Sequence, residues 1–113
     1  MEKGISRKPY KVSDQFDAHS TEVYHYTFNT FGYFQAERYL QKIRNAVLSL
    51  PELYLSYPEC RHLPTKSRMY RNIILDAHLI LYRITAERIE VLDIIHGAMS
   101  VSQIRKVRSI RIG

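Results

Sequence analysis

The sequence predicts an α+β fold in which an N-terminal helix hairpin packs on a small antiparallel β-sheet. Apolar residues recur at helical spacing through residues 15–50, a segment that contains one glycine and no proline. Three runs rich in Ile, Leu, Tyr and Val follow within residues 69–95. The links between these runs are too short for crossover helices, so neighbouring strands should be antiparallel. Helices followed by a strand meander are typical of the α+β class.

Residues 9–14, "PYKVSD", predict a short first strand ahead of the helices. Tyr10 and Val12 alternate with polar residues, as in a half-buried strand. Ser13 or Asp14 can then cap a helix, because either side-chain oxygen can accept a hydrogen bond from the free amides of the first turn.

The next segment, residues 15–32, carries two conflicting patterns. Its apolar residues recur at helical spacing, yet Tyr24, Tyr26 and Phe28 alternate as strand residues do. We predict a helix, because the segment is too long for one strand and has no internal turn residue. Gly32 offers a C-terminal stop.

Residues 33–50 predict a second helix with a single apolar stripe, which we expect to lie in the core. The stripe consists of Ala36, Tyr39, Leu40, Ile43, Val47 and Leu50. Pro51 should end this helix, because proline disrupts helical hydrogen bonding. The short turn at Gly32 makes the two helices an antiparallel hairpin.

Residues 51–68 hold three of the four prolines and should be mostly irregular, with a short strand near residues 60–63. The meander is expected at residues 69–76, 78–84 and 88–95. Alternation places Leu92, Ile94 and His96 on one face of the last strand. Both faces of the sheet are largely apolar, so one should bury against the helices while the other is available to a partner protein.

Residues 99–113 form a basic C-terminal tail beyond a predicted core of about residues 9–98. Apolar residues at 101, 104, 107 and 110 allow a short amphipathic helix. Two interpretations remain open. The tail is either a frayed surface segment or a basic arm that touches phosphates or an acidic partner.

Composition limits the class of protein. A chain of 113 residues fits a single domain. Its net charge of +6 favours an anionic partner, either nucleic acid, an acidic protein or a membrane surface, although many small domains are basic for solubility alone. The lone Cys60 excludes an internal disulfide and a cysteine-based zinc site, so we expect no metal or cofactor. The polar residues 1–10 do not resemble a signal peptide, and no apolar run approaches a membrane helix, so we expect a cytoplasmic protein that does not bind membranes.

Several motifs occur in a recognisable order. Phe31, Gly32, Ala36 and Tyr39 form "FG…A..Y" in the helix hairpin, Tyr70 and Arg71 open the meander, and His78 precedes "ILYR" at 80–83 and "IIHG" at 94–97. Over residues 9–98 the chain resembles the RelE/ParE family of toxins from bacterial type II toxin–antitoxin systems, also called plasmid stabilisation proteins. This resemblance implies a RelE/ParE-like toxin fold and a cognate acidic antitoxin that wraps the toxin and links it to operator DNA.

Two activities are known on this fold, and the resemblance leaves both open. RelE-like members are mRNA interferases that cut messages in the ribosomal A site, whereas ParE-like members are inhibitors of DNA gyrase. The pattern "H.I.YR" followed by "I.H" is more similar to the ParE side. The alternatives are a degenerate toxin that binds only its antitoxin and a basic RNA-binding domain, although paired aromatic motifs for RNA recognition are absent.

RNA cleavage without a metal needs a base, an acid and cations that stabilise the phosphate. The catalytic candidates are Arg71, Arg83, His96 and Tyr82. The candidates for phosphate contact are Lys66, Arg68, Arg105 and Arg108. For His78 we favour a structural role or a contact with the antitoxin. Many relatives carry a basic residue soon after the "IIHG" histidine, whereas Ala98, Met99 and Ser100 follow here, which weakens the ribonuclease assignment.

Overall fold

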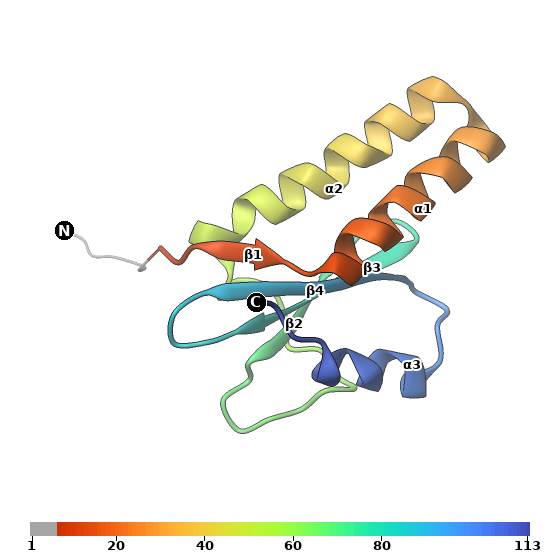
Figure 1. Cartoon of the computed structure of the whole chain (residues 1–113). Helices are drawn as coiled ribbons and strands as arrows, with labels where there is room; N and C mark the ends of the chain where they lie inside the picture. The colour runs from red at the N-terminus through yellow and green to blue at the C-terminus, as the bar shows by residue number, and fades with distance from the viewer. Residues whose placement is uncertain (1–6) are drawn as a thin grey trace.

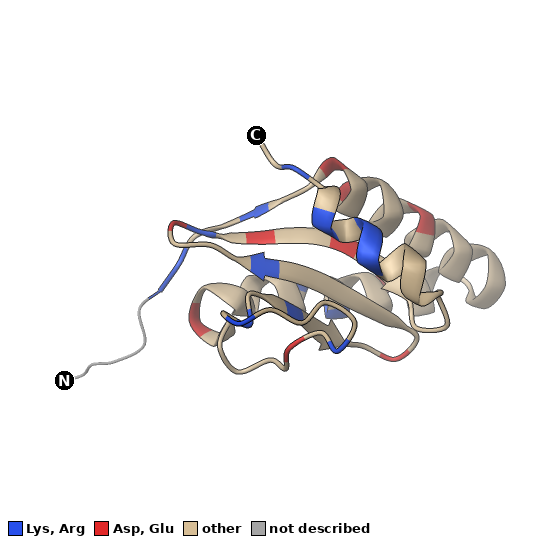
Figure 2. Ribbon diagram, turned by 90° about the horizontal axis from the view of Figure 1, so that it is seen from below, with Lys and Arg blue, Asp and Glu red and all other residues tan. Residues whose placement is uncertain are grey.

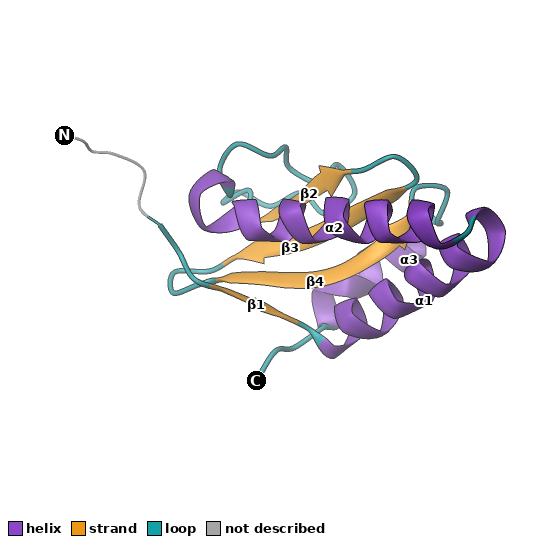
Figure 3. Ribbon diagram, turned by 90° about the horizontal axis from the view of Figure 1, so that it is seen from above, coloured by secondary structure: helices purple, strands orange, loops and turns teal. Residues whose placement is uncertain are grey.

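The computed structural model describes residues 7–113, so the polar positions 1–6 lie outside it. The elements in chain order are β1 (Tyr10–Val12), α1 (Asp14–Phe31), α2 (Tyr33–Leu53), β2 (Tyr70–Ile74), β3 (His78–Ile84), β4 (Ile89–His96), α3 (Val101–Arg105) and the 3₁₀ turn η1 (Lys106–Ser109). The α1–α2 hairpin covers one face of the sheet, and α3 lies on the other (Figures 1 and 3). The predicted α+β class is confirmed.

The sheet has four strands in the order β1-β4-β3-β2. Strands β2, β3 and β4 form the predicted antiparallel meander. Strand β1 instead runs parallel to β4, with Tyr10 opposite Ile89 and Val12 opposite Val91, so the expectation of a purely antiparallel sheet is wrong. The helix hairpin separates β1 from the meander, and no tight turn therefore forces β1 to run antiparallel to its neighbour.

Helix α1 resolves the ambiguous aromatic segment as predicted. Ser13 is its cap, because the Ser13 hydroxyl oxygen accepts from the Phe16 amide at 2.9 Å and the same hydroxyl donates to the Leu92 carbonyl of β4. Gly32 ends the helix with a φ of 91°, a left-handed conformation that favours glycine. The chain turns there directly into α2.

Pro51 does not end α2, contrary to the prediction. The helix continues to Leu53 with Pro51 inside its last turn. Proline removes one amide donor, but the next turn still closes because the Tyr54 amide donates to the Leu50 carbonyl at 3.0 Å. A proline near the end of a helix therefore costs one hydrogen bond without stopping the chain from completing the turn.

Two hydrophobic clusters lie on the two faces of the sheet. The first joins the helix pair to one face and includes Phe16, Ile43, Leu50 and Ile80. The second joins the long loop and the C-terminal tail to the other face, and it buries Ile104, Val107 and Ile110 of the tail with Leu63 of the loop and Leu92 of β4. Residues 99–113, which we predicted as a tail beyond the core, thus pack on the sheet and close the second cluster.

A β-bulge in β4 changes which sheet face its side chains lie on, compared with the prediction. Leu81 pairs with Asp93 and Tyr82 pairs with Val91, so Leu92 is an extra residue between the two pairs. Ile94 consequently joins the helix-side cluster while Leu92 joins the tail-side cluster. The predicted grouping of Leu92 with Ile94 assumed unbroken alternation, which one inserted residue reverses.

The long loop holds a single bridge, Glu59 opposite Arg71, in place of the short strand expected near residues 60–63. Asp93 at the bulge accepts from its neighbouring amide of Ile94 at 2.8 Å and pairs with His19 Nδ1 of α1 at 2.6 Å. This pair ties α1 to the sheet. Within residues 7–113, no helix is long and apolar enough to span a bilayer.

Candidate functional site

The C-terminal tail is held on the sheet by an ionic clamp centred on Glu90. Arg83 donates to Glu90 Oε1 at 2.6 and 2.8 Å and to the Ile110 carbonyl at 3.0 Å. Arg88 donates to Glu90 Oε2 at 3.0 Å and to the Ile112 carbonyl at 2.8 Å. Burial alone would raise the pKa of Glu90, but the hydrogen bonds from the two arginines outweigh it and lower this pKa. Glu90 thus positions Arg83 and Arg88, the two arginines that hydrogen-bond to the tail backbone.

Tyr70 extends this clamp toward the outer surface of the tail. Its ring lies 5.7 Å from the Arg83 guanidinium carbon and 6.0 Å from that of Arg108. The hydroxyl of Tyr70 also accepts from Arg83 at 3.3 Å. The Arg83 guanidinium is already bound to Glu90 and to the tail. Arg83 therefore has a structural role, and it does not offer the free cation that a phosphate group would need.

Arg71 lies on the opposite face of the sheet from Arg83. It stands across from Tyr82 in the β2–β3 register, whereas Arg83 stands across from Tyr70. The Arg71 guanidinium donates to the carbonyls of Leu55 and Tyr57, both at 3.0 Å, and to that of Arg68 at 3.1 Å. Arg71 therefore fastens the long loop, and it does not meet Arg83.

Tyr82 is fully buried in the helix-side cluster, with 0% of its surface exposed. Its hydroxyl donates to the Tyr54 carbonyl at 2.6 Å, and burial raises its pKa. A ring in this position can neither stack on a nucleotide base nor pass a proton to a substrate. The predicted catalytic role of Tyr82 is therefore wrong for this structure.

His96 is exposed at the end of β4 and faces His78 across the strands, with ring centroids 5.5 Å apart. His78 Nδ1 bonds the Tyr39 hydroxyl at 2.8 Å, which gives His78 a structural contact as expected. Burial, and secondly the neighbouring His96, lower the pKa of His78. His78 and Arg83 lie at opposite ends of β3, roughly 17 Å apart at about 3.4 Å per residue, so the arginine and histidine candidates do not converge.

The four candidates for phosphate contact are all exposed. Lys66 and Arg68 lie on the long loop, while Arg105 and Arg108 lie on the tail. Loop and tail share the sheet face opposite the helix pair, and Figure 2 shows blue segments gathered there. Phosphate contact by these residues stays a prediction.

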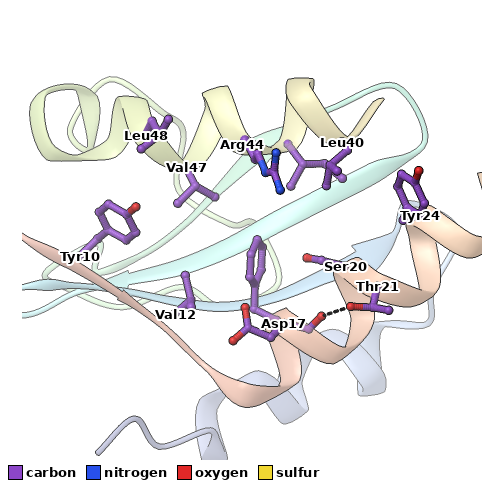
Figure 4. A pocket seen from close by; sticks show the side chains of 12 residues that line it. Tyr10, Val12, Asp17, Ser20, Thr21, Tyr24, Leu40, Arg44, Val47 and Leu48 are labelled. Carbon is purple, nitrogen blue, oxygen red and sulfur yellow. Dashed lines mark hydrogen bonds between the residues drawn. The ribbon is translucent and has the colours of Figure 1, made fainter. Parts of the chain in front are cut away.

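A groove between α1 and α2 was not predicted. Its volume is about 670 Å³, and Figure 4 shows Leu40, Arg44 and Val47 of α2 facing α1 across it. Ser20 of α1 lines the groove, and among the described residues its hydroxyl is the buried side-chain polar atom that lacks a hydrogen-bond partner. The helical stripe correctly indicated burial, but it could not show that small polar residues of α1 leave the two helices apart.

The tip of the helix hairpin, also not predicted as a surface, is strongly aromatic. Phe34 is 80% exposed, Phe31 and Tyr26 are each 65% exposed, and Tyr33 is 56% exposed. These four residues, which lie within six positions of Gly32 in the sequence, form what we call the aromatic tip. Residues 24–36 contain no Lys, Arg, Asp or Glu. The sequence signal for this surface is the presence of aromatic residues outside the buried stripe.

With this geometry in place, the sequence model of a family described as "ParE toxin of type II toxin-antitoxin system, parDE" matches residues 10–101. The chain belongs to the ParE toxin family. Two relatives, each a "Toxin ParE1" from the Mycobacterium tuberculosis strains CDC 1551 / Oshkosh and ATCC 25618 / H37Rv, are 29% identical over 98 residues, which cover 83% of this chain and 94% of the relative.

The fold of this ParE-family chain is similar to a solved chain described as "Chromosomal ParDE TA system from P. aeruginosa". The TM-score is 0.66 at 17% identity, and the match covers 81% of this chain and 98% of the other. The RelE/ParE resemblance is thereby confirmed on the ParE side. The family match ends at residue 101, so the cations of the tail lie beyond it.

Proposed function

We propose that this ParE-family toxin inhibits growth by binding DNA gyrase, without cutting RNA. The observation that carries the proposal is the scatter of the ribonuclease candidates. Tyr82 is sealed in the core, Arg71 and Arg83 are bound on opposite sheet faces, and His96 lies at the far strand end. An acid, a base and a phosphate-binding cation must meet at one bond, and these groups do not.

The aromatic tip supports a protein as the target. Exposed aromatic side chains gathered on one surface are typical of protein interaction sites, where buried aromatic anchors carry much of the binding energy. The tip projects from the end of the helix hairpin away from the sheet (Figure 1). We propose that Phe31 and Phe34 insert into the gyrase surface.

The groove between α1 and α2 supports a separate contact with the antitoxin. Leu40 and Val47 offer apolar surface, and Arg44 places a cation for an acidic chain at the same groove, which Asp17 of α1 also lines. The unpartnered Ser20 hydroxyl can bond to a backbone group of an inserted segment. We propose that a segment of the acidic antitoxin lies in this groove, so that antitoxin and gyrase use neighbouring parts of the helix layer.

The test is gyrase supercoiling with purified toxin, paired with messenger cleavage in a translating extract. We expect wild-type toxin to block supercoiling and to leave messages intact. Phe31→Ala with Phe34→Ala should weaken the block at least about tenfold, since each lost aromatic anchor costs about 1–2 kcal/mol. Leu53→Ala, an exposed apolar residue at the other end of α2, is the matched control.

His96→Ala should leave inhibition unchanged, because the proposal assigns no proton transfer to that side chain. Cut messages with normal supercoiling would replace the proposal with the ribonuclease alternative. Antitoxin binding with neither effect would indicate the degenerate toxin.

A further inference from the structure

We propose that the exposed cations of the C-terminal tail bind the phosphate backbone of duplex DNA, so that the toxin contacts the DNA held by its target as well as the target protein. The surface consists of Arg105, Lys106, Arg108 and Arg111, here called the basic tail face. The part of the inference that concerns the target rests on the proposed gyrase function. Binding of DNA by the isolated toxin does not.

Charge is segregated between the two layers of the molecule. Helices α1 and α2, residues 14–53, carry five carboxylates and three Lys or Arg. The tail, residues 99–113, carries four Lys or Arg and no Asp or Glu. Among the ion pairs of the described residues, none involves a cation of the basic tail face. The positive charge there is consequently free to meet an anionic ligand.

The basic tail face lacks the apolar anchors that a protein partner would need. Ile104, Val107 and Ile110 point into the tail-side cluster and are 4%, 2% and 9% exposed. The residues between them, which face outward, are cationic or small and polar. Protein interfaces are depleted of Lys and depend on buried aromatic or apolar anchors, whereas phosphate binding needs only clustered cations. The composition favours nucleic acid over an acidic protein.

The backbone of the tail, which carries these cations, is held in place before any ligand arrives. The Arg83 and Arg88 clamp fixes the carbonyls of Ile110 and Ile112, and Arg108 lies over the Tyr70 ring. At the start of the tail, Ser100 and Gln103 form a reciprocal capping box on α3. Because the backbone that carries them is already ordered, the cations lose less conformational entropy on binding than those of a free arm would.

Contacts of this kind are independent of base sequence. Each neutralised phosphate releases counterions, so the affinity should fall steeply with salt concentration. This contact differs from operator recognition, which we expect only through the antitoxin. Gyrase holds duplex DNA, so a bound inhibitor can meet it there. If the aromatic tip of the helix layer contacts gyrase, the basic tail face on the opposite layer is still available to contact this DNA.

The experiment is fluorescence anisotropy of a labelled random-sequence duplex titrated with the full-length toxin alone, over a series of salt concentrations. Arg105→Glu together with Arg111→Glu should weaken binding at least about tenfold and reduce the salt slope by about two, one for each lost phosphate contact. Both side chains are exposed, and the structure gives neither a side-chain hydrogen bond. Thermal unfolding should therefore be nearly unchanged.

The matched control compares single reversals of equal charge. Arg38→Glu on the helix layer should change affinity less than about twofold, whereas Arg105→Glu should weaken it several-fold. Equal loss in both variants would mean that net charge alone binds DNA and would overturn the proposal. The proposal would also be overturned if the wild-type toxin did not bind the duplex. It would be overturned as well if the tail variants kept their affinity for the duplex and lost only their affinity for a polyglutamate peptide titrated in the same way. Duplex binding without gyrase inhibition would instead count against the gyrase proposal.

Discussion

Glu90 is the residue on which the tail side of the molecule depends. It stands directly opposite Arg83 in the β3–β4 register and receives hydrogen bonds from Arg83 and Arg88. Glu90 is only 9% exposed, so its charge is stable there because two cations replace the lost water. Removing that charge would leave both arginines with backbone acceptors but without a counter-ion.

Glu90→Gln should therefore destabilise the fold by about 3–5 kcal/mol, which is the range for breaking a buried ion pair by removing one partner. Urea unfolding measures this change. Glu52→Gln is the matched control, because Glu52 pairs with Arg7 on an exposed surface, where such pairs contribute less than about 1 kcal/mol. Equal effects of the two substitutions would contradict the clamp.

His78 should give the protein a dependence of stability on pH. Its pKa is lowered from the ordinary value of 6.5, so the unfolded chain binds the proton more tightly than the folded protein does. Stability is then complete above about pH 6.5 and falls as the pH drops below that value toward the folded pKa. Glu90 acts in a lower window, because its own pKa is lowered from 4.5.

The measurement is the urea midpoint of unfolding between pH 7.5 and pH 5. His78→Gln should flatten the fall in this window, while His25→Gln, on the exposed surface of α1, should leave it as in wild type. An unchanged pH profile in His78→Gln would contradict the assignment.

Individual roles were the least predictable part of the site. Residue types and spacing identified Arg83 as a cation on a strand, but only the hairpin register places Glu90 opposite it. The alternation of residues in β3 is equally compatible with an exposed and a buried Tyr82. The neighbouring sequence does not show that the Tyr82 hydroxyl reaches the Tyr54 carbonyl, which lies far away along the chain. Burial and pairing across strands are tertiary properties, which explains why the roles proposed for Tyr82 and Arg83 did not fit.

At the scale of elements, the tail shows how a short pattern is decided by its surroundings. The apolar spacing in residues 101–110 allowed either a frayed segment or a basic arm. The structure anchors its apolar side and exposes its basic side, so neither alternative describes the tail completely. A helix of five residues is unstable by itself, and its order comes from packing on the sheet.

Ile104→Ala should consequently cost about 3 kcal/mol of stability, as for other large-to-small changes in a core. Val101→Ala in the same helix should cost less than about 1 kcal/mol, since Val101 is 38% exposed. Chemical unfolding of the two variants tests this difference. Similar small losses would mean that the tail is only loosely attached.

The long elements were predictable for a physical reason. Both helices and the three strands of the meander carry enough periodic residues to outweigh local conflicts, as α1 did despite its alternating aromatics. The parallel pairing of β1 and the bulge at Leu92 were not predictable, because each depends on the neighbouring strand in the sheet and its register. The groove between the helices was missed for the same reason.

At the scale of the whole molecule, the two proposals assign different partners to the two faces of the sheet. The helix layer presents the groove and the aromatic tip, which are suited to proteins. The opposite layer presents the basic tail face, which is suited to phosphates. Under these two proposals, the antitoxin neutralises the toxin on one face, while the effect on the target uses both faces.

The proposed action on gyrase is tested most directly by induced expression in a bacterial host, with DNA synthesis and translation followed separately by labelled precursors. The proposal predicts an early arrest of replication with DNA damage, while messages stay intact and translation continues at first. An immediate stop in translation accompanied by cleaved messages would contradict it, and so would unimpaired growth in cells that contain the folded toxin without antitoxin.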